Sequence, residues 1–439
     1  MTIIDCRARG AQCGAALATA LLALVLALPA GAGSKSPAAP SVTGSVLCWG
    51  DNSTDQCSVP AGAASGVKAV AGGDSHSLAL KSDGSVLAWG CGDGLDFGQC
   101  AVPAGAASGV IEVDAGNYHS LALKSNGSVV AWGCGVGFDF GQCAVPAGAA
   151  SGVKVVAAGT HSLALKSDGS VVAWGCGGFN NFGQCTVPAG AASGVIAVDA
   201  GWYHSLALKS DGSVLAWGCS SNNVGQCTVP AGAASGVIAV AAGVYHGLAL
   251  KSDGSVLAWG CSGVDYGQCT VPAGAASGVI AVAAGVSHGL ALKSDGSVVA
   301  WGCGAGDFGQ CTIPPGAASG VTEVAAGSYH SLAIDSSPPP SAVSLRAFWA
   351  SGTGSGTRLH WRTAHETQTV GFNLYRQQRG KLVKLNAVLI PSVFGGTTRG
   401  HAYSFVDRGV RRGMPSTYRL QAVSLGGTRA WLGTVVARR

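Results

Sequence analysis

Residues 193–232 read SGVIAVDAGWYHSLALKSDGSVLAWGCSSNNVGQCTVPAG. This stretch contains four short β-prone runs, GVIAV, HSLAL, GSVLAW and QCTVP, and Asp211-Gly212 separates the second run from the third. Asp-Gly favours a two-residue hairpin turn, because both central residues of that turn need a positive φ. One such unit therefore predicts a small antiparallel sheet of four strands.

The unit recurs along most of the chain. Trp-Gly pairs follow one another in steps of 40 to 43 residues, at Trp49, Trp89, Trp132, Trp174, Trp217, Trp259 and Trp301. Seven four-stranded units with this period predict an all-β fold, a seven-bladed β-propeller. The array starts late, with 44–50 as a third run, and stops early, with 330–334 as a second run. These ends together complete one blade, so we expect them to close the ring and remove a free sheet edge.

The pattern AGxxHSLALKxDGxVxAWG, followed by GQ and VP, resembles the regulator-of-chromosome-condensation repeat family over residues 44–334. Within that family, the pattern GQxTVPAxAxSGVxAxAAG is similar to the secreted bacterial β-lactamase-inhibitory members. The resemblance implies a seven-bladed propeller, in agreement with the repeat count. It also implies inhibition of a penicillin-recognising enzyme as one activity to test, although the loops of this chain, with their Cys, are different.

Fourteen Cys follow residue 32, two in each repeat. In six repeats one Cys follows Trp-Gly and the other follows Gly-Gln, which predicts disulfides that each close a loop of about ten residues. The predicted pairs are Cys91 with Cys100, Cys134 with Cys143, Cys176 with Cys185, Cys219 with Cys227, Cys261 with Cys269, and Cys303 with Cys311. Zinc sites need closer ligand spacings and a convergent fourth ligand, so metal binding is the weaker alternative. Cys48 precedes its Trp, which leaves open whether it pairs with Cys57.

The loop before each His and the loop between paired Cys lie at one end of the blades if strand directions alternate. All eleven Phe and Tyr of the propeller fall in these loops. Aromatic side chains dominate protein interfaces, so this end is the candidate binding face. The candidate partner-binding residues are Trp202, Tyr203, Phe138, Asp139, Phe179, Asn180, Asn181, Tyr118, Tyr245 and Tyr329. A further aromatic residue recurs before Gly-Gln, and packing over the disulfide is the favoured interpretation for Phe97, Phe140, Phe182, Tyr266 and Phe308.

One His begins the second run of every repeat, at His76, His119, His161, His204, His246, His288 and His330. We expect these residues to satisfy local backbone groups, and a metal ring at the channel mouth is the alternative. No catalytic triad or calcium loop stands apart from the repeat, so we expect no enzymatic activity, no metal and no cofactor. Two other functions remain as alternatives: an extracytoplasmic hydrolase or lyase with its site over the channel, and a structural envelope spacer.

The N-terminus has the order of a secretory signal peptide. Arg7 and Arg9 precede an apolar run at 15–28 and small residues that end at Ala32, where we place cleavage. The run has 14 residues, fewer than the roughly 20 that span a membrane, so we expect no membrane span. We expect a bacterial-type protein that is secreted, periplasmic or at the cell surface, in an oxidising compartment that suits disulfides.

The repeat ends at a Pro-rich segment, and a second domain follows. We expect a signal peptide at 1–32, a linker at 33–43, the propeller at 44–335, a Pro-rich linker at 336–341 and a β-sandwich at 342–439. Seven β-prone runs predict the sandwich: SLRAFWA, RLHWRTA, GFNLYRQ, KLVKLNAVLI, HAYSFVD, STYRLQAV and RAWLGTVVARR. Residues 359–376, LHWRTAHETQTVGFNLYR, are similar to fibronectin type III-like modules of secreted bacterial proteins.

The two parts of the chain carry opposite charge. Residues 33–340 contain 9 Lys and Arg and 18 Asp and Glu, a net charge of −9, whereas residues 341–439 contain 15 and 2, a net charge of +13. The basic domain has three interpretations: binding of an anionic envelope polymer, docking onto the acidic propeller, or a solvated surface without a ligand. We expect a secreted, non-enzymatic binding protein whose propeller recognises an extracytoplasmic protein. Nucleic acid is the least favoured partner outside a cell.

Overall fold

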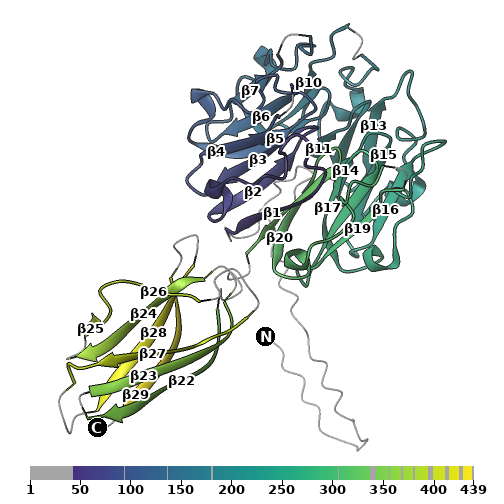
Figure 1. Ribbon diagram of the computed structural model, residues 1–439. Coiled ribbons are helices and arrows are strands. Elements are labelled where there is room, and N and C mark those ends of the chain that lie inside the picture. The colour runs from purple at the N-terminus through teal and green to yellow at the C-terminus, as the bar shows by residue number, and fades with distance from the viewer. Residues whose placement is uncertain are drawn as a thin grey trace, which may run out of the picture.

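A computed structural model describes most of the chain after residue 42 (Figure 1). The described residues are 43–92, 94–135, 137–178, 181–304, 306–336, 343–354, 356–366, 369–378, 381–393, 399–410, 415–424 and 429–437. The expected signal peptide, 1–32, and nearly all of the expected linkers, 33–43 and 336–341, lie outside them. Within the described part of the chain, no helix is long and apolar enough to cross a membrane.

Seven three-stranded antiparallel sheets form the blades of a propeller, which confirms the predicted fold. The blades are, in order, β2 (Val67–Gly72), β3 (His76–Lys81) and β4 (Val86–Gly90); β5 (Val110–Ala115), β6 (His119–Lys124) and β7 (Val129–Gly133); β8 (Val153–Ala158), β9 (Ser162–Lys166) and β10 (Val171–Trp174); β11 (Val195–Ala200), β12 (His204–Lys209) and β13 (Val214–Gly218); β14 (Val237–Ala242), β15 (His246–Lys251) and β16 (Val256–Gly260); β17 (Val279–Ala284), β18 (His288–Lys293) and β19 (Val298–Gly302); and β20 (Val321–Ala326), β21 (His330–Asp335) and β1 (Ser45–Gly50). We number these blades 1 to 7.

Each blade has three strands, so the prediction of four-stranded units is wrong. The fourth run, at 226–230 in one repeat, forms turns. Its Gln226 carbonyl accepts a hydrogen bond from the indole N–H of Trp259 in the next blade, at 2.9 Å, instead of from a strand partner. The Pro at the end of the run has no N–H to donate to a sheet. A 3-10 helix of three residues follows each such Pro: η1 (Ala61–Ala63), η2 (Ala104–Ala106), η3 (Ala147–Ala149), η5 (Ala189–Ala191), η6 (Ala231–Ala233), η7 (Ala273–Ala275) and η8 (Pro315–Ala317).

Strand β1 closes the ring, as predicted. It pairs with β21 from the other end of the array, with Ser45 opposite Asp335. The indole N–H of Trp49 in β1 also donates to the Gln310 carbonyl at 2.8 Å. The closure extends to the central channel, where a Cβ added to Gly327 would lie only 2.7 Å from the carbonyl oxygen of Gly73. Only glycine fits at such a close approach of two backbones.

The propeller core lies between neighbouring blades. Seven clusters of buried apolar side chains each combine residues from two adjacent blades. In one of them, Leu78 and Leu80 of blade 1 pack with Val113 and Trp132 of blade 2. Leu78 and Leu80 are fully buried. Burial of one such side chain stabilises the fold by about 1.5–3 kcal/mol, so each blade depends on its neighbours.

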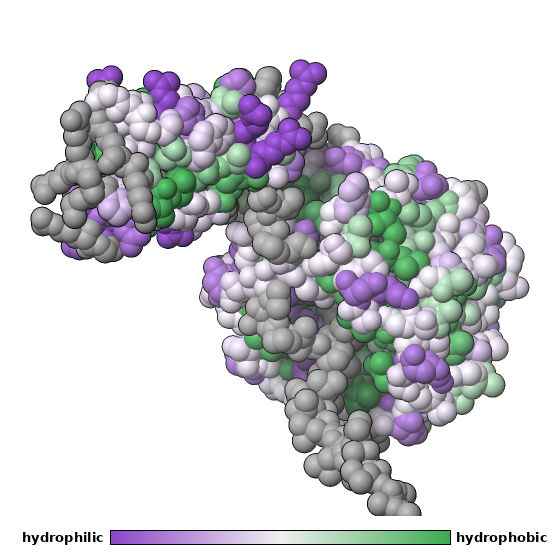
Figure 2. Space-filling model, turned by 90° about the horizontal axis from the view of Figure 1, so that it is seen from below, coloured by the Kyte–Doolittle hydropathy of each residue, from purple (hydrophilic) through white to green (hydrophobic). Residues whose placement is uncertain are grey.

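Residues after 342 form two sheets that share one core. The first sheet has the order β22 (Ser344–Thr353), β23 (Gly356–His365) and β27 (Ala402–Asp407). The second has the order β25 (Lys381–Lys384), β24 (Thr369–Gln378), β28 (Ser416–Ser424) and β29 (Arg429–Ala437), and β26 (Ile390–Pro391) also pairs with β24. Trp361 from the first sheet and Phe372, Leu374 and Tyr418 from the second are fully buried in the shared core. Strongly hydrophilic side chains project from the outside of this domain (Figure 2).

One expected strand of this domain is wrong. The run at 381–390 forms two short strands, β25 and β26, because Asn386 interrupts it. The Asn386 side chain is buried, accepts a hydrogen bond from Leu374 N at 2.8 Å and donates to Val388 O at 2.9 Å. These bonds turn the chain between the two strands. The likeness to fibronectin type III-like modules stays a prediction.

Candidate functional site

One end of the propeller carries two sets of loops, and we call it the loop face. The first set links the first two strands of each blade, as residues 73–75 do in blade 1. The second set follows the third strand of each blade. In blade 1 the third strand, β4, ends at the same end of the blade at which β3 starts, since Gly90 pairs with His76. The other end, the turn face, carries the Asp-Gly turns, where the Gly84 carbonyl accepts a hydrogen bond from Val110 N. The two loop sets therefore share one end, as expected from the alternating strands.

Seven disulfides hold the second set of loops. Six have Cα atoms 6.1 to 6.4 Å apart and match the predicted pairs, namely Cys91–Cys100, Cys134–Cys143, Cys176–Cys185, Cys219–Cys227, Cys261–Cys269 and Cys303–Cys311. The pairing that the sequence left open, Cys48 with Cys57, is also formed, with Cα atoms 5.1 Å apart. Cys48 lies within β1, so this bridge starts inside a blade and the other six start after one.

A buried Gln supports each loop, and the sequence reasoning missed this role. Gln99 is 1% exposed. Its Oε1 accepts a hydrogen bond from Phe97 N, its Nε2 donates to Leu95 O, both at 2.6 Å, and its carbonyl accepts the indole N–H of Trp132 at 2.9 Å. The signal was present in the repeated Gly-Gln pair, since a buried polar residue that recurs in every unit needs a set of partners.

Aromatic rings from neighbouring blades meet on the loop face. Around Tyr118, the Phe138 ring lies 4.4 Å away and the Phe97 ring 5.4 Å away, between centroids. The Phe97 and Phe138 rings are also 4.5 Å apart. Blade 1 supplies Phe97 and blade 2 supplies the other two rings, so the group bridges two blades.

A second aromatic group surrounds Tyr203. Its ring centroid lies 4.8 Å from Phe182, 5.5 Å from Tyr245 and 6.2 Å from Trp202. These side chains come from blades 3, 4 and 5. In each group, a Phe from a disulfide loop packs on a Tyr of the next blade.

A third pair, Phe308 and Tyr329, lies 5.2 Å apart between centroids. It repeats the same arrangement across blades 6 and 7, and the Phe308 side chain is 55% exposed. The structure thus brings six of the seven expected aromatic contact residues into three groups or pairs. The seventh, Phe179, lies outside the described residues, as does Asn180.

Burial and neighbouring groups raise the pKa of several tyrosines on the loop face. Burial, together with the neighbouring Tyr245 and Tyr118, raises the pKa of Tyr203 to about 12. Burial and Asp74 raise the pKa of Tyr118, and burial, Asp74 and Tyr245 raise that of Tyr329. The pKa of Asp74 is itself raised by burial, although hydrogen bonds from Ser328 and Ser75 oppose the rise. The phenols of Tyr118, Tyr203 and Tyr329 are therefore neutral donors at physiological pH.

Asp139 and Asn181, two of the candidate partner-binding residues, make a hydrogen bond that recurs in other repeats. Asp139 Oδ1 accepts a hydrogen bond from Gly141 N at 2.8 Å, and Asn181 Oδ1 accepts one from Gly183 N at 3.0 Å. Equivalent bonds are made by Asp96, Asn223, Asp265 and Asp307. These side chains shape the loop, and their contact with a partner stays a prediction.

Blade 3 interrupts the ring of loop-face side chains. In each blade a glycine at the channel, such as Gly73 in blade 1, precedes the repeated His. Two residues separate the glycine from the His in six blades, whereas only Thr160 separates them in blade 3. The second residue, Tyr203 in blade 4, uses its carbonyl to accept a hydrogen bond from Cys219 N at 2.9 Å. Blade 3 lacks this residue, so no tyrosine stands between Tyr118 and Tyr203.

The seven repeated His are buried, and five of them link neighbouring blades. In five blades the Nε2 atom bonds the Ser hydroxyl of the next blade, as His76 does with Ser120 at 2.9 Å. In these five blades a side chain replaces the expected backbone partner. Gly247 and Gly289 stand at this Ser position in blades 5 and 6. Burial lowers the pKa of His76 to about 3, and no described group of three or more His, Cys, Asp or Glu could hold a metal ion.

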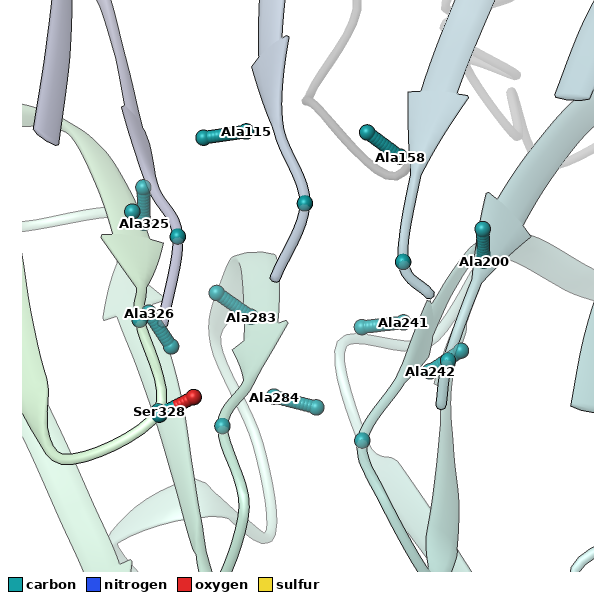
Figure 3. Close-up of a pocket in the computed structure, with 18 of the residues that line it drawn as sticks. Ala115, Ala158, Ala200, Ala241, Ala242, Ala283, Ala284, Ala325, Ala326 and Ser328 are labelled. Carbon is teal, nitrogen blue, oxygen red and sulfur yellow. The ribbon is translucent and has the colours of Figure 1, made fainter. Parts of the chain in front are cut away.

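Residues from all seven first strands line a cavity of about 100 Å³ in the channel. Small side chains surround it, among them Ala115, Ala158 and Ser328 (Figure 3). Its carboxylates have partners: Asp114 accepts a hydrogen bond from Ala158 N at 2.8 Å. Pockets for drug-sized ligands measure about 300–1,000 Å³, so this cavity is too small for a ligand of that size.

The loop face carries negative charge only. The two loop sets contain no Lys or Arg in any blade. Seven described Asp lie in these loops: Asp51, Asp55, Asp74, Asp96, Asp139, Asp265 and Asp307. The turn face differs, since Lys81 and its equivalents donate hydrogen bonds there to loop carbonyls such as that of Gly62.

Comparison with known proteins agrees with this architecture. Six stretches match the regulator of chromosome condensation (RCC1) repeat, at residues 67–99, 110–142, 153–184, 195–226, 237–268 and 279–310. Prp20p from Saccharomyces cerevisiae is similar in structure, with a TM-score of 0.51 and 21% identity, over 66% of this chain and 90% of that chain. The yeast RCC1 (Prp20) structure with Kap60 gives a TM-score of 0.50 and 21% identity, over 67% and 90%.

At this identity the structural likeness shows the fold alone. No curated protein matches the chain in sequence. The matched repeats carry the Trp, Gln and His that join each blade to the next, as the contacts above show. Through these repeats, the chain belongs to the regulator of chromosome condensation (RCC1) repeat family.

Proposed function

We propose that this is an exported, non-enzymatic binding protein that holds a partner protein on the loop face of its propeller. The observation that carries the proposal is the gathering of aromatic rings from different blades on a face with carboxylates and no Lys or Arg. Tyr and Trp combine a large apolar body with a polar tip, which suits interface contacts. The seven disulfides support export, because such bonds persist in oxidising compartments.

The scaffold suits this task. Disulfides and buried Gln residues fix the backbone of the loops. The outer side chains of these loops differ between blades, so the contact surface can vary on a constant backbone. The position of Phe138 illustrates this, because its carbonyl accepts the Gln142 amide in the same way as Leu95, Val264 and Gly306 accept theirs. Prp20p, which shares the fold, is described as binding Gsp1p and histones. A protein partner is therefore compatible with this scaffold.

The basic C-terminal domain has a separate role in the proposal. It attaches the protein to an anionic polymer of the cell envelope, because its net charge of +13 attracts polyanions. The chain leaves the propeller after Asp335, which pairs with Ser45 at the turn-face end of β21. The connection to this domain therefore starts at the end opposite to the loop face.

The test is affinity capture with the full mature chain, from culture and envelope fractions and with a purified β-lactamase, at moderate salt. The loop-face variant carries Trp202→Ala and Phe138→Ala. The control carries Ile111→Ala and Ile238→Ala, which remove apolar side chains that are 49% and 47% exposed on first strands. We expect the control to retain the captured protein and the loop-face variant to bind it at least about thirtyfold more weakly, as for interface hot spots. Equal binding by both variants would refute the proposed face.

A further inference from the structure

The C-terminal domain exposes charge of one sign only. Its sequence contains just two acidic residues, Glu366 and Asp407, and both are buried, with exposures of 0% and 5%. Glu366 accepts hydrogen bonds from Tyr403 at 2.7 Å and from Thr363 at 2.6 Å. Asp407 forms an ion pair with Arg376 at 2.5 Å. Both carboxylate side chains of this domain are therefore buried, whereas most of its described Arg and Lys side chains are exposed.

The outer face of the sheet β22–β23–β27 combines cations with an aromatic platform. Leu359 and Trp361 of β23 point into the core and are fully buried. Successive side chains of a strand alternate between its two faces, so Arg358, His360 and Arg362 lie on the outer face. Both Arg side chains are exposed.

Trp349 of β22 lies opposite His360 in this sheet. The two rings are stacked, with centroids 5.1 Å apart and planes within 7° of parallel. His360 Nε2 is 3.0 Å from Ser351 Oγ, which fixes the imidazole, and Trp349 remains 42% exposed. The pair forms a flat aromatic platform, and the Trp349 side of it is open to solvent.

A hollow of about 400 Å³ adjoins the platform. Arg346, Arg362 and His401 line it together with the backbone around Gly400. Arg362 thus borders both the platform and the hollow. Arg358 and Arg362 are four residues apart on one strand, a span of roughly 13 Å, which matches an extended ligand more closely than a single ion.

We propose that this outer face binds an anionic polysaccharide. The C–H face of a sugar ring packs on the Trp349 ring, whose π face carries partial negative charge. The guanidinium groups of Arg358 and Arg362 bind the acidic substituents of the sugars, since Arg donates paired hydrogen bonds to carboxylate, sulfate or phosphate. The proposal rests on the attachment role of the basic domain and names its site.

The experiment measures binding of the full mature chain to polygalacturonate, dextran sulfate, neutral dextran and single-stranded DNA. One variant, Trp349→Ala, removes the platform without a change in charge. A second carries Arg358→Gln and Arg362→Gln. The matched control carries Lys381→Gln and Lys384→Gln, two exposed cations of β25 in the other sheet. Thermal unfolding of each variant confirms that the domain is folded.

We expect the wild-type chain to bind at least one acidic polymer and not neutral dextran. Trp349→Ala and the double Arg variant should each weaken binding about tenfold or more, and the Lys control less than about threefold. Preference between the two acidic polymers identifies carboxylate or sulfate as the recognised group. Equal losses in the Arg and Lys variants would overturn this face but keep the attachment role. No binding by the wild-type chain would overturn both, and tighter binding of single-stranded DNA than of either polymer would overturn the choice of polysaccharide.

Discussion

At the residue scale, the repeated His shows how one side chain links two blades. Each His is fully buried, and five of them bond a Ser hydroxyl from the next blade. The sequence identified these residues as structural by their repetition. It did not identify the partner, because the Ser lies 43 or 44 residues further along the chain in the first blades and the contact forms only once blades are adjacent.

This arrangement predicts that acid destabilises the propeller well above the pKa of carboxylates. Burial lowers the pKa of the repeated His to about 3 or 4, whereas an unfolded chain has His with a pKa of about 6.5. The folded state thus favours neutral His, so its stability is fully present above pH 6.5 and is lost as the pH falls toward 4. Each His contributes up to about 1.4 kcal/mol per pH unit in this window.

Calorimetry of the full chain between pH 7.5 and 4.5 checks this expectation. The propeller transition should shift to lower temperature steadily below pH 6.5. The transition of the C-terminal domain serves as internal control, because none of its described His is buried. A propeller transition that stays constant down to pH 4.5 would contradict the assignment of neutral, buried His.

At the element scale, hydrophobic pattern and Asp-Gly turns correctly predict three strands in each repeat. The fourth predicted strand has neither signal, and it is absent from the structure. The first three runs of each repeat form strands, since their apolar residues pack between blades. The fourth run ends in Val-Pro and contains the buried Gln, whose backbone and side chain bond a loop and a Trp. The sequence shows that this run has a β-prone composition. It does not show that hydrogen bonds to the loop and to the Trp replace the hydrogen bonds of a strand pair.

The same limit applies to the loop face. Sequence predicted which loops share one end, because alternating strand direction dictates it. It did not predict that Asp139 and Asn181 serve the loop itself, because a hydrogen bond over two residues is not evident from composition. Blade 3 is one residue shorter at Thr160, which the sequence shows, but the resulting gap between Tyr118 and Tyr203 is evident only from the blade geometry.

Strand β1 offers the sharpest test of an element. A chain that starts at residue 51, with Cys57→Ser to avoid a free thiol, loses the buried Val46 and Trp49 and exposes the edge of β21. We expect a loss of about 5 kcal/mol, or roughly 10 °C in the Tm of the propeller, together with self-association through the open edge. A chain that starts at residue 43 is the control and should match the mature protein in Tm and in sedimentation. A shortened chain that stays monomeric with an unchanged Tm would show that β1 does not close the ring.

At the scale of the whole molecule, charge is separated along the chain. The loop face carries Asp without Lys or Arg, and the C-terminal domain exposes Arg and Lys without Asp or Glu. The chain leaves the propeller at Asp335, at the end opposite to the loop face. One molecule therefore presents complementary surfaces from two separate parts of its chain.

Contact between the basic domain of one copy and the loop face of another is head-to-tail, and such contacts build open chains unless they close into a ring. Their attraction depends on ionic strength, because the Debye length falls from about 30 Å at 0.01 M salt to about 10 Å at 0.1 M. We therefore expect the mature protein to form larger species in sedimentation velocity at 0.01 M salt and to be monomeric at 0.3 M. The double variant Arg358→Gln and Arg362→Gln should reduce this association. An acidic polysaccharide should disrupt it, since the polymer competes with the loop face for the same cations. Sedimentation that is identical at both salt concentrations would mean that the two charged surfaces do not meet, and the basic domain would then be free for the envelope polymer even at low salt.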